Sequence, residues 1–333
     1  MINTENANNV NNDPSPMSSA LDLLTTTRSK LKSYNIKDFM QLQIPQAEYI
    51  LHPILCERRH VMIYAPRGIG KTWFSLSLGY SAATGKTLIG RYPAMKPCRV
   101  VYIDGEMPVD DLQRRLAKIT GGDIPPEFEE NFRILTHDLC EGPMPSIASS
   151  LGQDEYEPFI KNADVIILDN VSSLMPHTNE NDSEGWGQVK EWSFDLRRRG
   201  KSVVFIHHAG KNGQQRGTSA REDHLDVVLA LKHPPGLRTD QGARFNVHFE
   251  KARGFFGQDA TPFSLEMSTT ENGIKWHYKP LASNADHEKQ KQRLDQVLKL
   301  AADGNTTRAI ADATGISRST VQRMLKSSTL AAN

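Results

Sequence analysis

Five short apolar runs, with helical patterns between them, constrain the fold of this 333-residue sequence most strongly. Each run is rich in β-branched residues and lacks polar alternation, which is typical of strands buried on both faces. They are 61–65 (VMIYA), 99–105 (RVVYIDG), 132–136 (FRILT), 164–170 (DVIILDN) and 202–209 (SVVFIHHA). The helical patterns cover 72–85, 109–120 and 183–200. This order predicts an α/β fold with a mostly parallel sheet and helices on both faces.

The stretch from Ile63 to Trp73 (IYAPRGIGKTW) connects the first predicted strand to the first predicted helix. A turn here exposes the N–H groups at the helix N-terminus, and the helix dipole adds partial positive charge, so an anion is favoured. Glycines let the backbone approach phosphate oxygens, a lysine can reach the β- and γ-phosphates, and a threonine hydroxyl can ligate Mg²⁺. The predicted nucleotide contacts are Pro66, Arg67, Gly68, Ile69, Gly70, Lys71, Thr72 and Trp73, with Thr72 also a metal ligand.

This stretch departs at one position from the G-x-x-x-x-G-K-[ST] pattern of phosphate loops, because Ala65 occupies the first glycine position. Pro66 fixes φ beside it, while Gly68 and Gly70 leave the rest of the bend able to wrap an anion. The alternative is a chance Gly-Lys-Thr turn. The strand before the stretch and the helix after it favour the nucleotide site.

Acidic residues follow two of the predicted strands. Asp169 ends the run 164–170, where open α/β sheets bind ligands and a carboxylate can hold the water shell of Mg²⁺. Its alternative role is to cap a turn. Asp104 and Glu106 follow the run 99–105, where a carboxylate can polarise the water that attacks a γ-phosphate. We predict that Glu106 is the general base and that Asp104 shapes the turn; alternatively, both are solvated loop acids.

The composition indicates where the protein works and says little about the reaction that it catalyses. The formal net charge is +1, so contacts with nucleic acid must come from local basic patches. The three cysteines form no C-x-x-C pair, which argues against a disulfide framework or zinc site and fits a reducing cytosol. No apolar run approaches the roughly 20 residues of a membrane span, and no signal-peptide pattern begins the sequence. We therefore expect a soluble, cytoplasmic protein.

The two ends of the chain differ in composition from the middle. Residues 1–20 are rich in Asn and have little to bury, which predicts a disordered tail. The other predicted parts are an N-terminal helix and lead-in (21–50), the α/β core (51–280), a charged linker (281–293) and a helical module (294–333). Within the core, the predicted hairpin strands that extend the sheet are 224–232, 243–254 and 273–279.

The segment 306–327 (TTRAIADATGISRSTVQRMLKS) has the pattern of a helix, a glycine turn and a second helix. Its apolar spacing resembles the helix-turn-helix units of resolvases and transcription factors. Ser317 is expected to cap the second helix, whose N-terminus would enter the major groove of DNA. The predicted DNA contacts are Arg318, Ser319, Thr320 and Arg323. A small packing or oligomerisation module is the alternative.

Four of these motifs occur in an order and spacing that resemble the RecA-like ATPases of the plasmid RepA type, which are relatives of DnaB-type helicases and of KaiC. The motifs are APRGIGKTW, VVYIDGEMP, VIILDN, and VVFIHHAGK followed by QRGTS. The resemblance covers about residues 51–278. It implies a P-loop NTPase with a RecA-like core that uses ATP and Mg²⁺ and assembles into a homo-oligomeric ring, a hexamer, around single-stranded DNA.

The resemblance also implies roles for individual residues. Glu106 matches the catalytic glutamate of the family, and His208 matches its γ-phosphate sensor, whereas the neighbouring histidine at 207 fits a core position better. In the rings of the family, a neighbouring subunit supplies a positive charge to the ATP site. Arg216 in QRGTS is the trans-acting arginine that we favour, and Lys251 and Arg253 in EKARG are the alternatives.

The loop 210–217 is glycine-rich and basic, and related ring ATPases carry DNA-contacting loops near this position. Lys211 is the predicted contact, and a plain flexible loop is the alternative. Together these features predict an ATP-hydrolysing DNA motor, a helicase of a plasmid or mobile element. A DNA-bound regulator or loader that uses ATP as an assembly switch is the main alternative. A repressor with a degenerate nucleotide site is a third, for which Ala65 is the sole argument.

Overall fold

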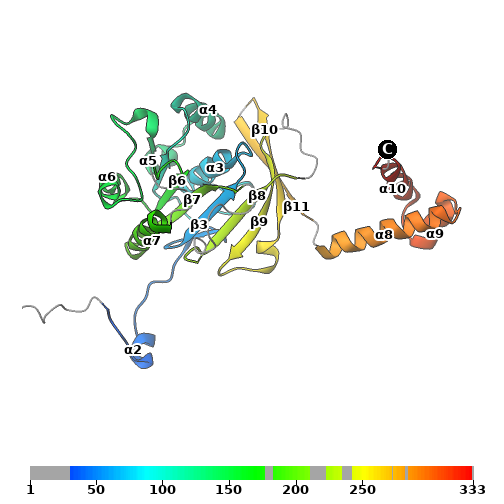
Figure 1. Cartoon of the computed structure of the whole chain (residues 1–333), viewed down its shortest axis with the longest axis horizontal. Coiled ribbons are helices and arrows are strands. Elements are labelled where there is room, and N and C mark those ends of the chain that lie inside the picture. The colour runs from blue at the N-terminus through cyan, green and yellow to red at the C-terminus, as the bar shows by residue number, and fades with distance from the viewer. Residues whose placement is uncertain are drawn as a thin grey trace, which may run out of the picture. The chain divides into compact units, whose positions relative to one another are not determined.

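The computed structural model describes residues 31–176, 183–210, 223–234, 242–271, 273–281 and 284–331. Nine strands in these ranges form one sheet in the order β11-β10-β9-β8-β3-β7-β6-β4-β5 (Figure 1). The parallel strands are β3 (His60–Ala65), β4 (Val100–Asp104), β5 (Phe132–Thr136), β6 (Val165–Asp169), β7 (Ser202–His208) and β8 (Val227–Lys232). The antiparallel strands are β9 (Arg244–Ala252), β10 (Phe263–Thr270) and β11 (Gly273–Pro280). The predicted mostly parallel sheet is confirmed.

The five strands predicted between residues 61 and 209 are β3 to β7. Every residue of β3, β4, β6 and β7 is buried, because these strands lie inside the sheet and helices cover both of its faces. This explains why their sequences show no polar alternation. β5 lies at the edge of the sheet and is only partly buried.

The C-terminal strands extend the sheet, as predicted. β8 pairs in parallel with β3, Val61 lying opposite Val227, and its other edge pairs antiparallel with β9. The antiparallel pair of β8 and β9 agrees with the predicted hairpin strands, whereas the parallel pairing of β8 with β3, which buries its apolar run, was not predicted. β10 was not predicted: its apolar alternation is limited to Phe263, Leu265 and Met267, and the second half of the strand is largely exposed.

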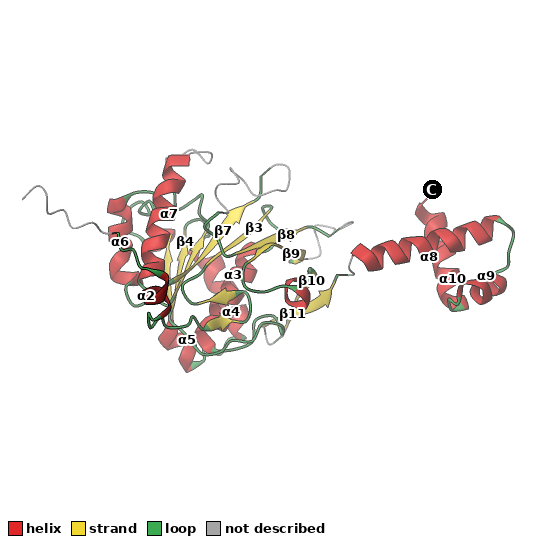
Figure 2. Cartoon of the chain, turned by 90° about the horizontal axis from the view of Figure 1, so that it is seen from below, coloured by secondary structure: helices red, strands yellow, loops and turns green. Residues whose placement is uncertain are grey.

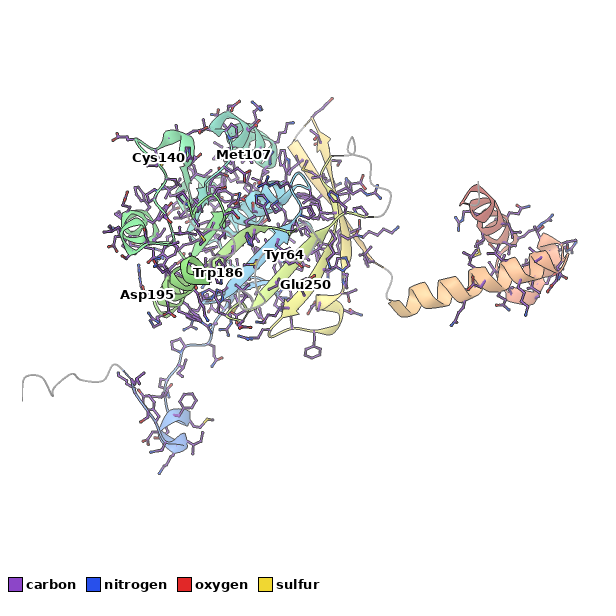
Figure 3. The ribbon with its side chains drawn as sticks, in the orientation of Figure 1. Tyr64, Met107, Cys140, Trp186, Asp195 and Glu250 are labelled. Atoms are coloured by element: carbon purple, nitrogen blue, oxygen red, sulfur yellow. The ribbon has the colours of Figure 1, made fainter. Side chains whose placement is uncertain are left out.

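Helices cover both faces of the sheet (Figure 2). They are α3 (Lys71–Thr84), α4 (Val109–Thr120), α5 (Pro126–Asn131), α6 (Ser150–Ile160) and α7 (Ser183–Arg198), with 3₁₀ turns η1 (His137–Leu139) and η3 (Gly257–Ala260). Phe74, Leu112 and Phe128 bury α3, α4 and α5 against one face. Tyr156 buries α6 against the other face, and so does Trp186 for α7 (Trp186 is labelled in Figure 3). Of these helices, α3, α4 and α7 were predicted, and α5 and α6 were not.

A polar contact joins the centre of the sheet to its antiparallel extension. The hydroxyl of Tyr64 on β3 donates a hydrogen bond to the carboxylate of Glu250 on β9 (Figure 3). The ammonium of Lys232, on the intervening strand β8, lies 2.9 Å from the same carboxylate. The three strands are therefore tied together by side chains as well as by backbone hydrogen bonds.

The chain divides into one unit up to Gln46 and a second from Ala47 onward. The described part of the first unit contains α2 (Ile36–Met40), which Asn35 caps by accepting a backbone hydrogen bond. The second unit begins with a two-stranded ribbon of β1 (Tyr49–Leu51) and β2 (Leu55–Cys56). The predicted tail over 1–20 and the first ten residues of the predicted N-terminal helix and lead-in (21–50) lie outside the described residues.

Three helices end the chain: α8 (Asn284–Ala302), α9 (Thr307–Thr314) and α10 (Arg318–Ala331). They share a small core of Val297, Ile310 and Val321, and Gly315 makes the turn between α9 and α10 with a φ of 65°. The small all-α module is confirmed, and α8 already begins inside the segment predicted as a linker over 281–293. Within the described ranges, no helix combines the length and the apolar character needed to cross a bilayer.

Candidate functional site

A cleft of about 550 Å³ opens at the carboxyl ends of four neighbouring strands, β3, β7, β6 and β4. The four strands end within two residues of one another, because Ala65 is opposite His208, Asp104 is opposite Asp169, and Asp169 is opposite Ile206. This edge is where open α/β sheets bind ligands. Six of the predicted nucleotide contacts line the cleft: Arg67, Gly68, Gly70, Lys71, Thr72 and Trp73. The predicted residues Glu106, Asp169 and His208 line it too.

The loop between β3 and α3 has the backbone of an anion cradle. Gly70 is the N-cap of α3 with a φ of 112°, and a Cβ atom at this position would lie 2.7 Å from the Cβ of Ala243. Gly68 also has a positive φ, 76°. Only glycine fits both positions readily. The other two predicted contacts do not line the cleft: the side chain of Ile69 is buried in the core, and Pro66 offers its carbonyl to the loop lysine.

Lys71 is the buried positive charge of the cleft. Its side chain is on the first residue of α3, only 7% of the residue is exposed, and its Nζ lies 3.2 Å from the carbonyl oxygen of Pro66. Burial lowers the pKa of Lys71, while the carboxylates of Asp169 and Glu106 act in the opposite direction. An ammonium group held at a helix N-terminus in this way favours a multiply charged anion as its ligand.

Glu106 and Asp104 differ in burial and in hydrogen-bond partners. The carboxylate of Asp104 is buried and accepts the backbone N–H groups of Glu106 (3.1 Å) and Met107 (2.7 Å), so it shapes the turn after β4. Burial, followed by the nearby charge of Asp169, raises the pKa of Asp104 to about 7. The side chain of Glu106 is 57% exposed and faces the cleft, where it accepts a hydrogen bond from the amide of Asn170.

His208, and not His207, reaches the cleft. Successive residues of a strand point to opposite faces, and the ring Nε2 of His208 lies 3.5 Å from the Glu106 carboxylate. Burial and the charge of Lys71 lower the pKa of His208, which favours a neutral ring. A neutral imidazole can still donate one N–H to a phosphate oxygen. His207 is buried and does not line this cleft, in agreement with the prediction of a core position.

Asp169 is the second buried carboxylate of the cleft, with 4% of the residue exposed. Its Oδ2 accepts hydrogen bonds from the hydroxyl of Ser75, at 3.0 Å, and from the hydroxyl of Tyr102. Burial raises the pKa of Asp169, and these hydroxyls together with the ammonium of Lys71 counteract that rise. Neither Ser75 nor Tyr102 was predicted from the sequence, because their role depends on how α3 packs over β4 and β6.

The residues present fit a magnesium ion held jointly by protein and phosphate. Thr72 and Asp169 supply the hydroxyl and carboxylate oxygens that Mg²⁺ accepts, and both line the cleft. In the described part of the chain, no cluster of three or more His, Cys, Asp or Glu side chains forms a self-sufficient metal site. Mg²⁺ is commonly bound by one or two protein ligands plus phosphates and waters, so this sparse donor set is suited to it.

The two alternative trans-acting residues lie away from the cleft of their own subunit. Lys251 pairs with Val228 near the start of β8, at the opposite end of the strands from the phosphate loop. Arg253 follows at the same end, where its guanidinium lies 3.3 Å from the buried carboxylate of Asp226. Neither can therefore contact a nucleotide held in its own cleft. Arg216 and Lys211 lie outside the described residues.

The C-terminal module places its predicted DNA contacts on α10. Arg318 and Ser319 are exposed in the first turn of that helix, Thr320 is half-buried, and Arg323 is exposed one turn later. The hydroxyl of Ser317 accepts the backbone N–H of Thr320 at 3.4 Å, so the predicted cap is present. An exposed, capped helix start after a glycine turn has the form of a recognition helix.

Two protein families match the chain, one over the sheet domain and one over the C-terminal helices. A model of the AAA domain family matches residues 25–214, and a model of the homeodomain-like domain family matches residues 287–329. No curated protein shows a significant match. Among solved structures, a KaiC-like protein of the hyperthermophilic archaeon Pyrococcus horikoshii OT3 is similar over 68% of this chain and 93% of that chain, with 16% sequence identity and a TM-score of 0.49.

The AAA domain match spans more than half of the chain and contains the phosphate loop, Glu106, Asp169 and His208. The homeodomain-like match contains α9 and the described side chains of α10. These matches bear out the predicted ATPase core with a C-terminal helix-turn-helix module. The chain belongs to the AAA domain family, and its pairing of a P-loop ATPase domain with a homeodomain-like module indicates a DNA-associated ATPase.

Proposed function

We propose that this protein is a Mg²⁺-dependent ATPase that hydrolyses ATP while assembled on DNA, a helicase-like motor of the plasmid RepA type. The observation that carries the proposal is the convergence of Lys71, Glu106, Asp169 and His208 in one cleft at the ends of four adjacent strands. These residues come from four separate segments of the sequence. Their chemistry matches phosphoryl transfer to water: a cation, an exposed carboxylate, a metal-binding acid and a neutral donor.

Each side chain then has a distinct task in hydrolysis. Lys71 and the N–H groups at the start of α3 bind the phosphates, and the Glu106 carboxylate takes the proton of the attacking water. Asn170 fixes the orientation of Glu106 through its amide hydrogen bond. His208 donates a hydrogen bond to the γ-phosphate and lies close enough to Glu106 to respond to its movement. Bound Mg²⁺, held by Thr72 and Asp169, would neutralise charge on the phosphates.

A ring assembly explains why basic residues lie at the edge of the sheet opposite the cleft. Lys251 and Arg253 can contact a nucleotide only if it belongs to another copy of the chain. Arg216 is the trans-acting arginine that the sequence favours, and a homohexamer with single-stranded DNA near Lys211 in its channel is the assembly that we propose. A positive charge supplied in trans can be worth about 10³ to 10⁵ in rate.

Mixing experiments identify the trans-acting residue. Arg216→Ala, Lys251→Ala and Arg253→Ala proteins are each mixed with Lys71→Ala protein, and ATP turnover is followed across mixing ratios. Only a variant that has lost the trans-acting charge and kept its own cleft recovers activity, because the Lys71→Ala partner supplies the missing group. We expect recovery with Arg216→Ala. Turnover that stays at the sum of the separate proteins for all three variants would contradict a shared site.

The helix-turn-helix module is tested by charge removal in the full-length protein. Arg318→Ala and Arg323→Ala should each weaken duplex binding by about tenfold or more, since a base or phosphate contact contributes about 1–3 kcal/mol. Fluorescence anisotropy with labelled duplex DNA measures the affinity. Arg293→Ala, which removes an exposed arginine from α8 in the same module, is the matched control. Equal losses in all three variants would indicate a general charge effect instead of a recognition helix.

Strand separation is the step that divides a motor from an assembly switch. A forked-duplex unwinding assay with ATP tests it directly. Unwinding that requires ATP hydrolysis supports the motor. Hydrolysis without unwinding would support the alternative of a DNA-bound loader or regulator, which uses the same cleft.

A further inference from the structure

A buried tyrosine lies beneath the candidate magnesium site. Tyr102, in the middle of β4, is 0% exposed, and its ring packs 6.2 Å from the ring of Phe132 in the core. Its hydroxyl is hydrogen-bonded to the Oδ2 of Asp169 and lies 2.8 Å from the hydroxyl of Ser75 on α3. Ser75, also completely buried, lies 3.0 Å from the same Oδ2. Three elements of the fold, β4, β6 and α3, thus meet at one carboxylate oxygen.

The protons of this triad can be assigned from the chemistry of its groups. An ionised carboxylate has no proton and can only accept, whereas each hydroxyl has a single proton to donate. Tyr102 therefore donates to Asp169, and Ser75 donates either to the same oxygen or to the oxygen of Tyr102. Both hydroxyls approach Oδ2, which leaves the second carboxylate oxygen of Asp169 for the cleft that this residue lines.

We propose that Tyr102, with Ser75 as its partner, is a positioning residue for the metal site: its hydroxyl holds the Asp169 carboxylate in the orientation that receives Mg²⁺ together with ATP. This inference rests on the proposed function, because it concerns the metal that this function requires. Groups that orient a metal ligand through hydrogen bonds commonly change metal affinity by about 10- to 100-fold when they are removed. Tyr102 does not line the cleft itself, so it acts through Asp169.

If the hydroxyl of Tyr102 only stabilised the fold, its removal would have the same effect as the removal of any other buried tyrosine hydroxyl. The chain contains such a hydroxyl away from the cleft, which serves as a control. Tyr156 on α6 is also buried, and its hydroxyl donates to the carbonyl oxygen of Pro145 at 2.7 Å. It belongs to the core on the opposite face of the sheet. Tyr156→Phe therefore removes a buried tyrosine hydroxyl without touching Asp169, and it is the matched control for Tyr102→Phe.

The experiment measures how strongly Mg²⁺ and ATP support each other's binding. Calorimetry gives the Kd of ATP in excess EDTA and in excess Mg²⁺ for each full-length variant. The Kd in EDTA divided by the Kd in Mg²⁺ measures the coupling between the two ligands, and a larger ratio means that Mg²⁺ tightens ATP binding more. The binding of Mg²⁺ by free ATP is the same in every titration series and cancels between variants. We expect Tyr102→Phe to lower the ratio about tenfold while the Kd in EDTA stays within about twofold of wild type. Tyr156→Phe should leave the ratio unchanged.

Ser75→Ala provides a second test that does not alter the aromatic core. It should lower the ratio in the same direction by a smaller factor, because one donor to Oδ2 remains. The inference is overturned if neither Tyr102→Phe nor Ser75→Ala lowers the ratio, if Tyr156→Phe lowers it equally, or if Mg²⁺ does not tighten ATP binding to the wild type. Failure of the proposed function looks different, since the wild type would then bind no ATP in either buffer.

Discussion

Glu106→Gln should reduce DNA-stimulated ATP turnover by about 10² to 10⁴, the usual contribution of a general base. Glutamine keeps the size of the side chain and can still contact Asn170, but it cannot take a proton from water. The affinity for ATP should change little, because the phosphates are bound by the loop and by Lys71. A coupled assay of phosphate release gives the turnover, and calorimetry gives the affinity.

The control for this change is Glu130→Gln on α5, which alters an exposed carboxylate outside the cleft and should keep wild-type turnover. Wild-type activity in Glu106→Gln would remove Glu106 from its assigned role. Asp104 would not be a ready substitute, since its buried carboxylate is engaged by two backbone N–H groups.

Lys71→Ala should have the second large effect, and it acts on binding as well as on turnover. A hydrogen bond to a charged group contributes about 1.5–3 kcal/mol, so the Kd of ATP should rise about ten- to a hundredfold. Turnover should fall by about a further 10² to 10³, because the lysine also stabilises charge that develops on the phosphates. Lys118→Ala, on the exposed side of α4, is the control for the loss of one positive charge.

Hydrolysis at the wild-type rate by Lys71→Ala would mean that the loop after β3 is not the phosphate site.

The thermal stability of Lys71→Ala should be checked as well, because Lys71 is buried. Removing a cation whose pKa is already lowered by burial should leave the melting temperature close to wild type, so a loss of binding cannot be attributed to unfolding. Circular dichroism during heating measures this.

The central fold could be predicted because burial on both faces leaves a clear trace in sequence. β3, β4, β6 and β7 are nearly continuous apolar runs, and each was predicted as a strand. β10 is not a continuous apolar run, since its outer half is exposed and polar, although its pairing with β11 is local in sequence. The parallel pairing of β8 with β3 is likewise a long-range choice that local pattern does not encode.

The residues of the candidate site also divide into those that local sequence predicts and those that only the folded structure brings together. Residues adjacent to a strand end, such as Glu106 and Asp169, could be predicted because parallel strands bring their carboxyl ends together. The resemblance already favoured His208 over His207, and the structure places only His208 of the two at the cleft. Tyr102 and Ser75 could not be predicted, because hydroxyl groups in a strand and in a helix carry no signal of a shared partner. The residue that supplies the trans-acting charge could not be identified, because it would act on the cleft of a second copy of the chain, and a single sequence does not show where that copy lies.

Calorimetric titration of ATP into the wild-type protein in the presence of Mg²⁺ tests the central claim most directly, because every assigned role requires a nucleotide in the cleft after β3. We expect saturable binding at one site per chain that is strongly weakened in Lys71→Ala and retained in Lys118→Ala. Absence of binding by the wild type, or equal binding by Lys71→Ala, would contradict it.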